Sequence, residues 1–517
     1  MQIKRGDIKE SGINPKAVYD FVKRCEAEEL GTDSFILIKD GKVVCEGYHN
    51  PYNNETKHVM YSLSKTITAI ALGYAVDEGK ISLDDSICKY YGEYDRFGFN
   101  KPITMRHLVT MTAGKMIGMA ENRRNKDWIK IFFDAPYVFK PGKHFLYVND
   151  NFYLISAIIS KVYGETLVDF LKPRLFEPLG IEKPVWEVDK FGYAAGGWGL
   201  YLSIEELSKI VLCYAQNGMW DEKQVIPAEW VKESSSYQVP TNKKGHKDVT
   251  KGYGYGIWQI ARPESYRAYG LHGQLGYVFK DKNTVLVINS GVSRDEYLGD
   301  AVNDMLETLW DEPETEYYDK LSELVSSLGD KDDLPAQMRN RKLELDYNQK
   351  ALMTRSSVFA SMVHPTMTAV MNEKIGCIDR FILSLDKDYN LYLAWKEGSY
   401  VNKIKLGMDN EYEKTTIKLA GLEYNVFAKA AWTQEKVLTV LIRIGETCHV
   451  RKLEFDFKNE KHIKIKNTSS PDLATLATHY LDFSGMPLSP KLTTLLEEVV
   501  VPAVLLYGEP TFRIKKK

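Results

Sequence analysis

The spacing of apolar residues changes along this chain of 517 residues, and this change constrains the fold more than any other feature. From Leu63 to Ala75 the apolar residues recur with the period of a helix, and Gly79 follows as a helix stop signal. Beyond Gly376 apolar and polar residues alternate instead, as they do from Phe381 to Leu385. A chain of this length also exceeds the roughly 150 residues of an average domain. We therefore expect an α+β part followed by a separate β-rich, barrel-like part.

The boundaries between these parts follow from composition. Residues 1–312 mix helix and strand signals, and we expect them to form the chemically active domain. The segment 313–350 is rich in charged residues and contains Pro313 and Pro335, which is typical of a linker or a helical connection. Residues 351–517 would then form the C-terminal β-rich domain.

Strand signals occur at both ends of the first part. Phe35–Lys39 and Lys42–Tyr48 flank the pair Asp40–Gly41, which predicts a hairpin. Three further segments with strand signals come much later in the chain, at Gly252–Trp258, Gly276–Lys280 and Thr284–Asn289. The residues between the two groups show the patterns of helices and loops. We expect an antiparallel sheet built from both ends of this part, with an inserted helical subdomain on one side of a cleft.

Composition and charge argue against several classes of function. With a net charge of -2, 44% hydrophobic residues and 27% charged residues, nothing in the chain recruits nucleic acid or a membrane. The first residues lack the apolar segment of a secretory signal, so we expect a cytoplasmic protein, although a chain whose leader had been removed would begin in the same way. The six cysteines include no CxxC pair, and the ten histidines show no ligand spacing. We expect no disulfide framework, no metal and no cofactor, and the sequence does not specify an oligomeric state.

Ser62 and Lys65 form an S-x-x-K motif at the start of the expected helix. Residues three apart share a helix face, so the lysine amine can reach the serine hydroxyl. A desolvated lysine can accept the proton of that hydroxyl, and the helix N-terminus favours the oxyanion that develops during acyl transfer. The alternative is that Ser62 only caps a helix, since this motif also occurs by chance.

Several ordered segments favour the catalytic interpretation. Met60–Thr66 resembles the nucleophile helix of class C β-lactamases, penicillin-binding proteins and family VIII esterases. Four more segments resemble later segments of this family in the same order, at Ile103–Gly114, Pro141–Asn149, Gly196–Ser203 and Tyr253–Trp258. The resemblance covers residues from about 15 to 310. It implies a β-lactamase-like fold, an antiparallel sheet flanked by helices, with Ser62 as the nucleophile.

The resemblance also implies roles for Tyr147 and Asn149, which match the family's Y-x-N element. Tyr147 would share the proton relay with Lys65, and Asn149 would contact the amide or ester group of the substrate. A free phenol has a pKa of about 10, so Tyr147 can act as a base near neutrality only beside a cation, which Lys65 can supply. The alternative is an ordinary aromatic residue at a domain boundary.

The third motif of the family, K-T-G or H-x-G, does not occur unambiguously in this sequence. Alignment on Gly276 places Gly270–His272 at this motif, without a lysine, whereas alignment on the histidine places His272–Gln274 there. In either register a backbone N–H near Gly273 would complete the oxyanion hole with the N–H of Ser62. Gln274 and His272 would then lie near the reacting centre, although a single histidine in a strand is more often structural.

These features predict a serine hydrolase that acylates Ser62 and cleaves a small ester, amide or D-amino acid peptide. Two alternatives stay open among related activities, a β-lactamase and a DD-carboxypeptidase. A third lies outside enzymes: a penicillin-recognising sensor or an inactive binding protein. The expected partner is a small molecule or a short peptide.

The C-terminal part contains no motif for a second reaction. Its aromatic residues fit either a core or the edge of the cleft, at Trp395, Tyr400, Tyr424 and Trp432. We expect this part to pack as a β-domain or to shape access to the substrate.

Overall fold

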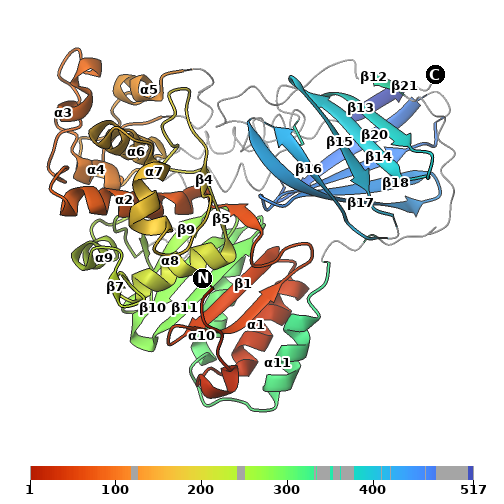
Figure 1. Ribbon diagram of the computed structural model, residues 1–517, viewed down its shortest axis with the longest axis horizontal. Coiled ribbons are helices and arrows are strands. Elements are labelled where there is room, and N and C mark those ends of the chain that lie inside the picture. The colour runs from red at the N-terminus through yellow and green to blue at the C-terminus, as the bar shows by residue number, and fades with distance from the viewer. Residues whose placement is uncertain are drawn as a thin grey trace, which may run out of the picture. The chain divides into compact units, whose positions relative to one another are not determined.

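The computed structural model describes residues 2–117, 126–241 and 251–330, and from the rest of the chain 334, 350–352, 361–362, 378–408, 410–419, 421–459, 462–472 and 511–515. The described residues form two compact units. The first unit ends at Leu328, and the second begins at Gly329 (Figure 1). Among the described residues, none of the helices combines the length and the apolar character that a membrane crossing needs.

The first unit contains helices of several lengths. The α-helices are α1 (Pro15–Ala27), α2 (Ser64–Asp77), α3 (Cys88–Tyr91), α4 (Met105–Val109), α5 (Trp128–Asp134), α6 (Asp150–Tyr163), α7 (Leu167–Leu171), α8 (Ile204–Ala215), α9 (Ala228–Ser234), α10 (Asp295–Thr308) and α11 (Tyr317–Ser326). Short helical turns lie at η1 (Ile8–Glu10), η2 (Tyr61–Leu63), η3 (Gly92–Tyr94), η4 (Lys172–Phe176) and η6 (Lys280–Lys282). Helix α11 falls in the segment for which the sequence predicts a linker or helical connection.

The strands of the first unit form one large sheet and two small ones. The large sheet has the order β2 (Lys42–Tyr48), β1 (Thr32–Lys39), β11 (Thr284–Ser290), β10 (Gln274–Phe279), β9 (Ser265–Gly270) and β8 (Trp258–Gln259). The small sheets are β3 (Lys57–Val59), β5 (Leu200–Ser203) and β4 (Val185–Trp186), and β6 (Met219–Trp220) with β7 (Lys223–Gln224). The large sheet joins strands from both ends of the unit, which confirms the expected α+β architecture.

Helices cover both faces of the large sheet (Figure 1). Gly276 of β10 lies against α8, because a Cβ there would meet the Val211 side chain at 2.6 Å. Phe35 of β1 points to the other face, where its ring contacts Phe21 of α1 with a centroid distance of 6.1 Å. Apolar side chains on alternate residues of each strand therefore fill two cores, one on each side of the sheet.

The prediction of a strand at Gly252–Trp258 is wrong for most of its length. Gly252 and Gly256 have positive φ angles of 127° and 72°, and Tyr253 forms an isolated bridge with Trp258. The chain therefore folds back on itself here and only its last residue enters β8. Glycines permit such turns because they lack a Cβ, and the aromatic residues between them imitate a strand pattern.

The second unit consists of two antiparallel sheets whose neighbouring strands follow chain order. They are β12 (Lys350–Leu352), β13 (Ile378–Leu385), β14 (Leu391–Glu397) and β15 (Tyr400–Leu406), and then β16 (Glu413–Leu419), β17 (Leu422–Gln434), β18 (Val437–Ile444), β19 (Val450–Asp456), β20 (His462–Ser470) and β21 (Phe512–Lys515).

The predicted β-rich character of this unit is confirmed, but no closed barrel is found among its described strands. The ladder breaks after β15, where Gly407 forms a parallel bridge with Lys429 of β17. Three of the predicted core aromatics are buried, namely Trp395, Tyr424 and Trp432. Tyr400 is partly exposed, and its hydroxyl accepts a hydrogen bond from the backbone of Gly421.

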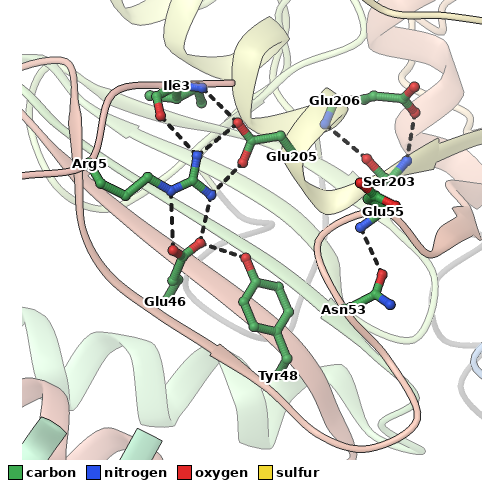
Figure 2. Close-up of polar contacts among 9 residues, drawn as sticks. All are labelled: Ile3, Arg5, Glu46, Tyr48, Asn53, Glu55, Ser203, Glu205 and Glu206. Atoms are coloured by element: carbon green, nitrogen blue, oxygen red, sulfur yellow. Dashed lines mark hydrogen bonds and ion pairs between the residues drawn. The ribbon is translucent and has the colours of Figure 1, made fainter. Parts of the chain in front are cut away.

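A group of charged residues links the N-terminal segment to other elements of the first unit (Figure 2). The Arg5 guanidinium lies between two carboxylates, at 2.9 Å from Glu205 and 2.8 Å from Glu46. Glu205 is buried and also accepts a hydrogen bond of 2.7 Å from the backbone of Ile3. The Tyr48 hydroxyl donates to Glu46 at 2.6 Å. One guanidinium thus joins the N-terminal segment, β2 and the start of α8.

We expect Arg5→Ala to lower the free energy of unfolding by about 1–2 kcal/mol, because Glu205 would keep its buried charge without a cation. The midpoint of thermal unfolding should fall by about 2–8 °C in calorimetry. Glu46→Gln is the matched control and should cost less, since Glu46 is more exposed than Glu205. Equal midpoints for Arg5→Ala and the unmodified protein would contradict this account of the charge group.

Candidate active site

Ser62 lies in the short turn η2, between β3 and α2. The residue before it, Tyr61, has a φ of 44°, in the left-handed region that side chains other than glycine rarely adopt. Such a conformation costs about 1–3 kcal/mol and occurs preferentially at functional sites. Two contacts hold the turn: Met60 donates its N–H to Leu200 at 2.7 Å, and the Tyr61 ring packs edge-on against His272 at 5.6 Å. The fold therefore fixes the backbone that presents Ser62.

Lys65 is completely buried in the first turn of α2, and its amine has three polar neighbours. The Nζ atom lies 3.0 Å from Ser62 Oγ, 2.7 Å from Asn149 Oδ1 and 2.6 Å from the carbonyl oxygen of Gly197. The structure thus brings together the serine, the lysine and the asparagine that the sequence singles out.

Burial lowers the pKa of Lys65 well below its usual value, although the charge of Asp150 opposes this shift. A neutral amine has two N–H donors and one lone pair. The oxygens of Asn149 and Gly197 can accept both donors, which leaves the lone pair for the hydroxyl proton of Ser62. This arrangement suits a general base for a serine nucleophile.

Two adjacent glycines bring the Gly197 carbonyl to the lysine. A Cβ on Gly197 would lie 2.5 Å from the backbone oxygen of Asn149, and one on Gly196 would lie 2.4 Å from that of Phe152. The hydroxyl of Thr68 donates to Gly196 at 2.8 Å. The glycines let this segment pack against α2 and α6 at once. The sequence marks the segment as a family match but does not assign a role to the carbonyl of Gly197.

Tyr147 lies with its ring 4.8 Å from Lys65 Nζ, measured to the ring centroid. The ring is buried and stacks on Trp258 at 5.8 Å, with an angle of 27° between the planes. Asn149 follows two residues later and occupies the N-cap position of α6, without a capping hydrogen bond from its side chain. The predicted Y-x-N pair is therefore next to the lysine, with Tyr147 held in place by aromatic packing.

The stretch predicted to carry the third motif lies in the β9–β10 hairpin. Strand β9 ends at Gly270, which pairs with Gln274 at the start of β10, so the residues between them form the hairpin loop. A Cβ on Gly270 would lie 2.3 Å from the backbone oxygen of Met60. Gly270 thus packs closely against the backbone of the nucleophile turn.

The other residues predicted for this motif have different surroundings. His272 is buried with a φ of 64°, and its Nδ1 lies 3.0 Å from the carbonyl oxygen of Val292. A Cβ on Gly273 would meet the Leu298 side chain at 2.7 Å, and the Gln274 amide donates to the Ser290 carbonyl at 2.6 Å. His272 contacts Tyr61 of the nucleophile turn. Gly273 instead lies against α10, and the side chain of Gln274 is bonded to β11. Their part in an oxyanion hole stays a prediction.

Sequence reasoning missed Tyr269, the last residue of β9 before Gly270. Its buried hydroxyl donates to Asp295 of α10. Its pKa is raised well above the usual value, first by burial and then by Asp295, and Tyr147 also contributes, so the two phenols lie near each other. The sequence gives no signal for this pairing because 26 residues separate Tyr269 from Asp295. Among the described residues of the first unit, no three side chains converge as metal ligands.

Comparison with known proteins identifies the family of this chain. A family model described as Beta-lactamase matches residues 22–304, more than half of the chain. An uncharacterized protein of Alkalihalophilus pseudofirmus is 25% identical over an alignment of 275 residues, and the match covers 47% of this chain and 75% of that protein. A D-aminopeptidase of Brucella anthropi is 26% identical over an alignment of 278 residues, and the match covers 48% of this chain and 52% of that enzyme.

Solved structures also resemble this chain, at lower identity. A penicillin-binding protein of Bacillus halodurans is 20% identical, with a TM-score of 0.44, over 55% of this chain and 98% of that one. The family match spans the nucleophile turn, α2, α6 and the β9–β10 hairpin, and it confirms the resemblance found in the sequence motifs. The chain belongs to the β-lactamase family.

Proposed function

We propose that this protein is a serine hydrolase that forms an acyl-enzyme on Ser62 and cleaves a small ester, an amide or a D-amino acid peptide. The observation that carries the proposal is the buried amine of Lys65, 3.0 Å from the hydroxyl of Ser62. A buried lysine without a carboxylate partner on its amine is costly to the fold, and a base for the serine explains why it is there.

The first half of the reaction forms the acyl-enzyme. Ser62 Oγ attacks the carbonyl carbon of the substrate while its proton passes to the neutral amine of Lys65. Backbone N–H groups of Ser62 and of the β9–β10 loop would stabilise the negative charge on the carbonyl oxygen. The attack gives a tetrahedral intermediate. When this intermediate collapses, the bond to the leaving group breaks, and the leaving group takes up a proton from Lys65 or Tyr147.

The second half of the reaction restores the enzyme. Lys65 or Tyr147 takes a proton from water, the hydroxide formed attacks the ester on Ser62, and the serine oxygen leaves with a proton. Asn149 would contact the amide or ester group of the substrate while its Oδ1 holds Lys65. Each proton removed in one half-reaction is returned in the same half.

The β9–β10 hairpin favours esters and simple amides over β-lactams. The segment Gly270–Leu271 offers neither the charge nor the hydroxyl with which K-T-G enzymes hold the β-lactam carboxylate. The similarity to a D-aminopeptidase supports amides of D-amino acids as a substrate class. A β-lactamase or DD-carboxypeptidase activity is the second candidate, and the family match is the observation that favours it.

We expect a short-chain p-nitrophenyl ester to be hydrolysed with a higher kcat/KM than nitrocefin, because Gly270–Leu271 offers no cation to the carboxylate of nitrocefin. Parallel steady-state assays with both chromogenic substrates measure this directly, and a D-amino acid p-nitroanilide completes the panel. Faster hydrolysis of nitrocefin would favour the second candidate. A stoichiometric burst without turnover on every substrate would instead identify a sensor.

A further inference from the structure

Two side chains of α2 bind consecutive carbonyl groups in the segment that supports the lysine amine. Lys65 Nζ donates to the carbonyl oxygen of Gly197 at 2.6 Å, and Thr68 Oγ1 donates to that of Gly196 at 2.8 Å. The two side chains are three residues apart, so they lie on the same face of the helix, and both are completely buried. The amine and the hydroxyl therefore hold the same short stretch of backbone.

This stretch of backbone forms an unusually tight turn. The N–H of Gly197 donates to the carbonyl of Ala195 at 2.5 Å, only two residues back, and Gly196 between them has a φ of 62°. Glycine permits this positive φ, but a γ-turn of this hand is rare and strained. Strained turns persist where the surrounding contacts hold them. The bond from Thr68 to the central residue of the turn is such a contact.

We propose that Thr68 is a positioning residue for the general base, because its hydroxyl holds the turn of residues 195–197 whose last carbonyl binds Lys65. This inference rests on the proposed function and adds a residue to it. A neutral amine can rotate about its last C–N bond unless its N–H groups have fixed acceptors. When the carbonyl of Gly197 keeps its place, one N–H of Lys65 is fixed, and the lone pair stays directed at Ser62.

Thr66 offers a matched comparison within the same helix. Its side chain is also buried, and its hydroxyl donates to the carbonyl of Gly256 at 2.7 Å. This bond joins α2 to the segment before β8, whereas the bond of Thr68 joins α2 to the turn that contacts the amine. The two threonines therefore make the same kind of bond to different segments, and the proposal assigns a role in the reaction to Thr68.

Thr68→Val tests the proposal, because valine has nearly the shape of threonine but lacks the hydroxyl. We expect kcat for a short-chain p-nitrophenyl ester to fall by about 10–100-fold, since small displacements of reacting groups have effects of this size. KM should change by no more than about twofold, because the buried Thr68 is out of reach of the substrate. Thr68→Ser keeps the hydroxyl and should keep most of the kcat.

Thr66→Val is the control for a general loosening of the fold. Both valine variants should lower the thermal midpoint, since each leaves a buried carbonyl without its donor. Only Thr68→Val should lower kcat by about tenfold or more. Thr68→Ala removes the same hydroxyl with a smaller side chain and should give the same loss of kcat, so the test does not depend on the folding of one variant.

A double variant measures whether Thr68 acts through Lys65. Lys65→Met already lacks the amine, so adding Thr68→Val to it should lower the remaining kcat by less than about twofold. The slow hydrolysis by these variants is followed at high enzyme concentration. If Thr68 affected the rate independently of the amine, the two losses would multiply.

The outcomes separate this proposal from the proposed function. An unchanged kcat in folded Thr68→Val, an equal loss of kcat in Thr66→Val, or a full additional loss in the double variant would overturn the positioning role of Thr68. Failure of the unmodified enzyme to hydrolyse any ester, with no labelling of Ser62 by a fluorophosphonate, would instead overturn the proposed function and this inference with it.

Discussion

Ser62→Ala should abolish turnover, with a fall in kcat of about 10³-fold or more, because the proposed reaction passes through a covalent bond to this oxygen. The same variant should no longer react with a fluorophosphonate probe. Its fold should be retained, since Ser62 is partly exposed and its polar neighbour Lys65 has two further acceptors. Steady-state assays, gel fluorescence of the labelled protein and the thermal midpoint measure these three properties.

Ser64→Ala is the matched control for Ser62→Ala. Ser64 lies two residues further on, is buried, and accepts a hydrogen bond from the Leu200 backbone at 3.2 Å. Its loss should cost stability through one unpaired N–H while labelling of Ser62 persists. Equal loss of labelling in both variants would mean that the assay reports the fold and not the nucleophile.

Lys65→Met should lower kcat by about 10²–10⁴-fold, the usual effect of removing a general base. The apolar side chain removes the burial penalty of the amine but leaves the oxygens of Asn149 and Gly197 without this donor, so the two effects on stability oppose each other. The variant should keep a cooperative thermal transition, and a fall in activity of a folded variant separates chemistry from folding. If Lys65→Met kept the kcat of the unmodified enzyme, another group would be the base.

The pH profile gives the same group a second test. Lys65 can accept a proton only when neutral, so the rate should rise with pH through its lowered pKa and then reach a plateau. Because that pKa lies well below the usual lysine value, the rise should come at lower pH than an exposed lysine would give. Lys65→Arg, whose guanidinium stays protonated, should remain inactive over the whole range.

The nucleophile pair could be predicted from the sequence because its geometry is local. Ser62 and Lys65 are three residues apart at a helix start, and helical spacing alone brings the amine to the hydroxyl. Asn149 is 84 residues from Lys65, and only the family resemblance indicated that they would meet. The large sheet was predictable for a similar reason, since the apolar runs of β1, β10 and β11 are strong signals by themselves.

The remaining features depend on how distant segments approach each other. The Gly197 carbonyl reaches Lys65 only because two glycines allow the chain to touch α2 and α6, and a sequence pattern does not encode that approach. The break between the two C-terminal sheets lies at Gly407, which forms a single backbone bridge to Lys429 of β17. The sequence could not predict this break, because apolar residues alternate in the same way in open sheets and in closed barrels.

Trapping of the acyl-enzyme tests the central claim most directly. The protein is mixed with a short-chain p-nitrophenyl ester, quenched in acid within the first turnover, and weighed by intact-protein mass spectrometry. Trypsin then releases the peptide of residues 58–65, and fragmentation locates the added acyl group. We predict one acyl group per chain, on Ser62 and not on Ser64. Turnover of the ester with no adduct, or with the adduct on another residue, would contradict the proposed mechanism.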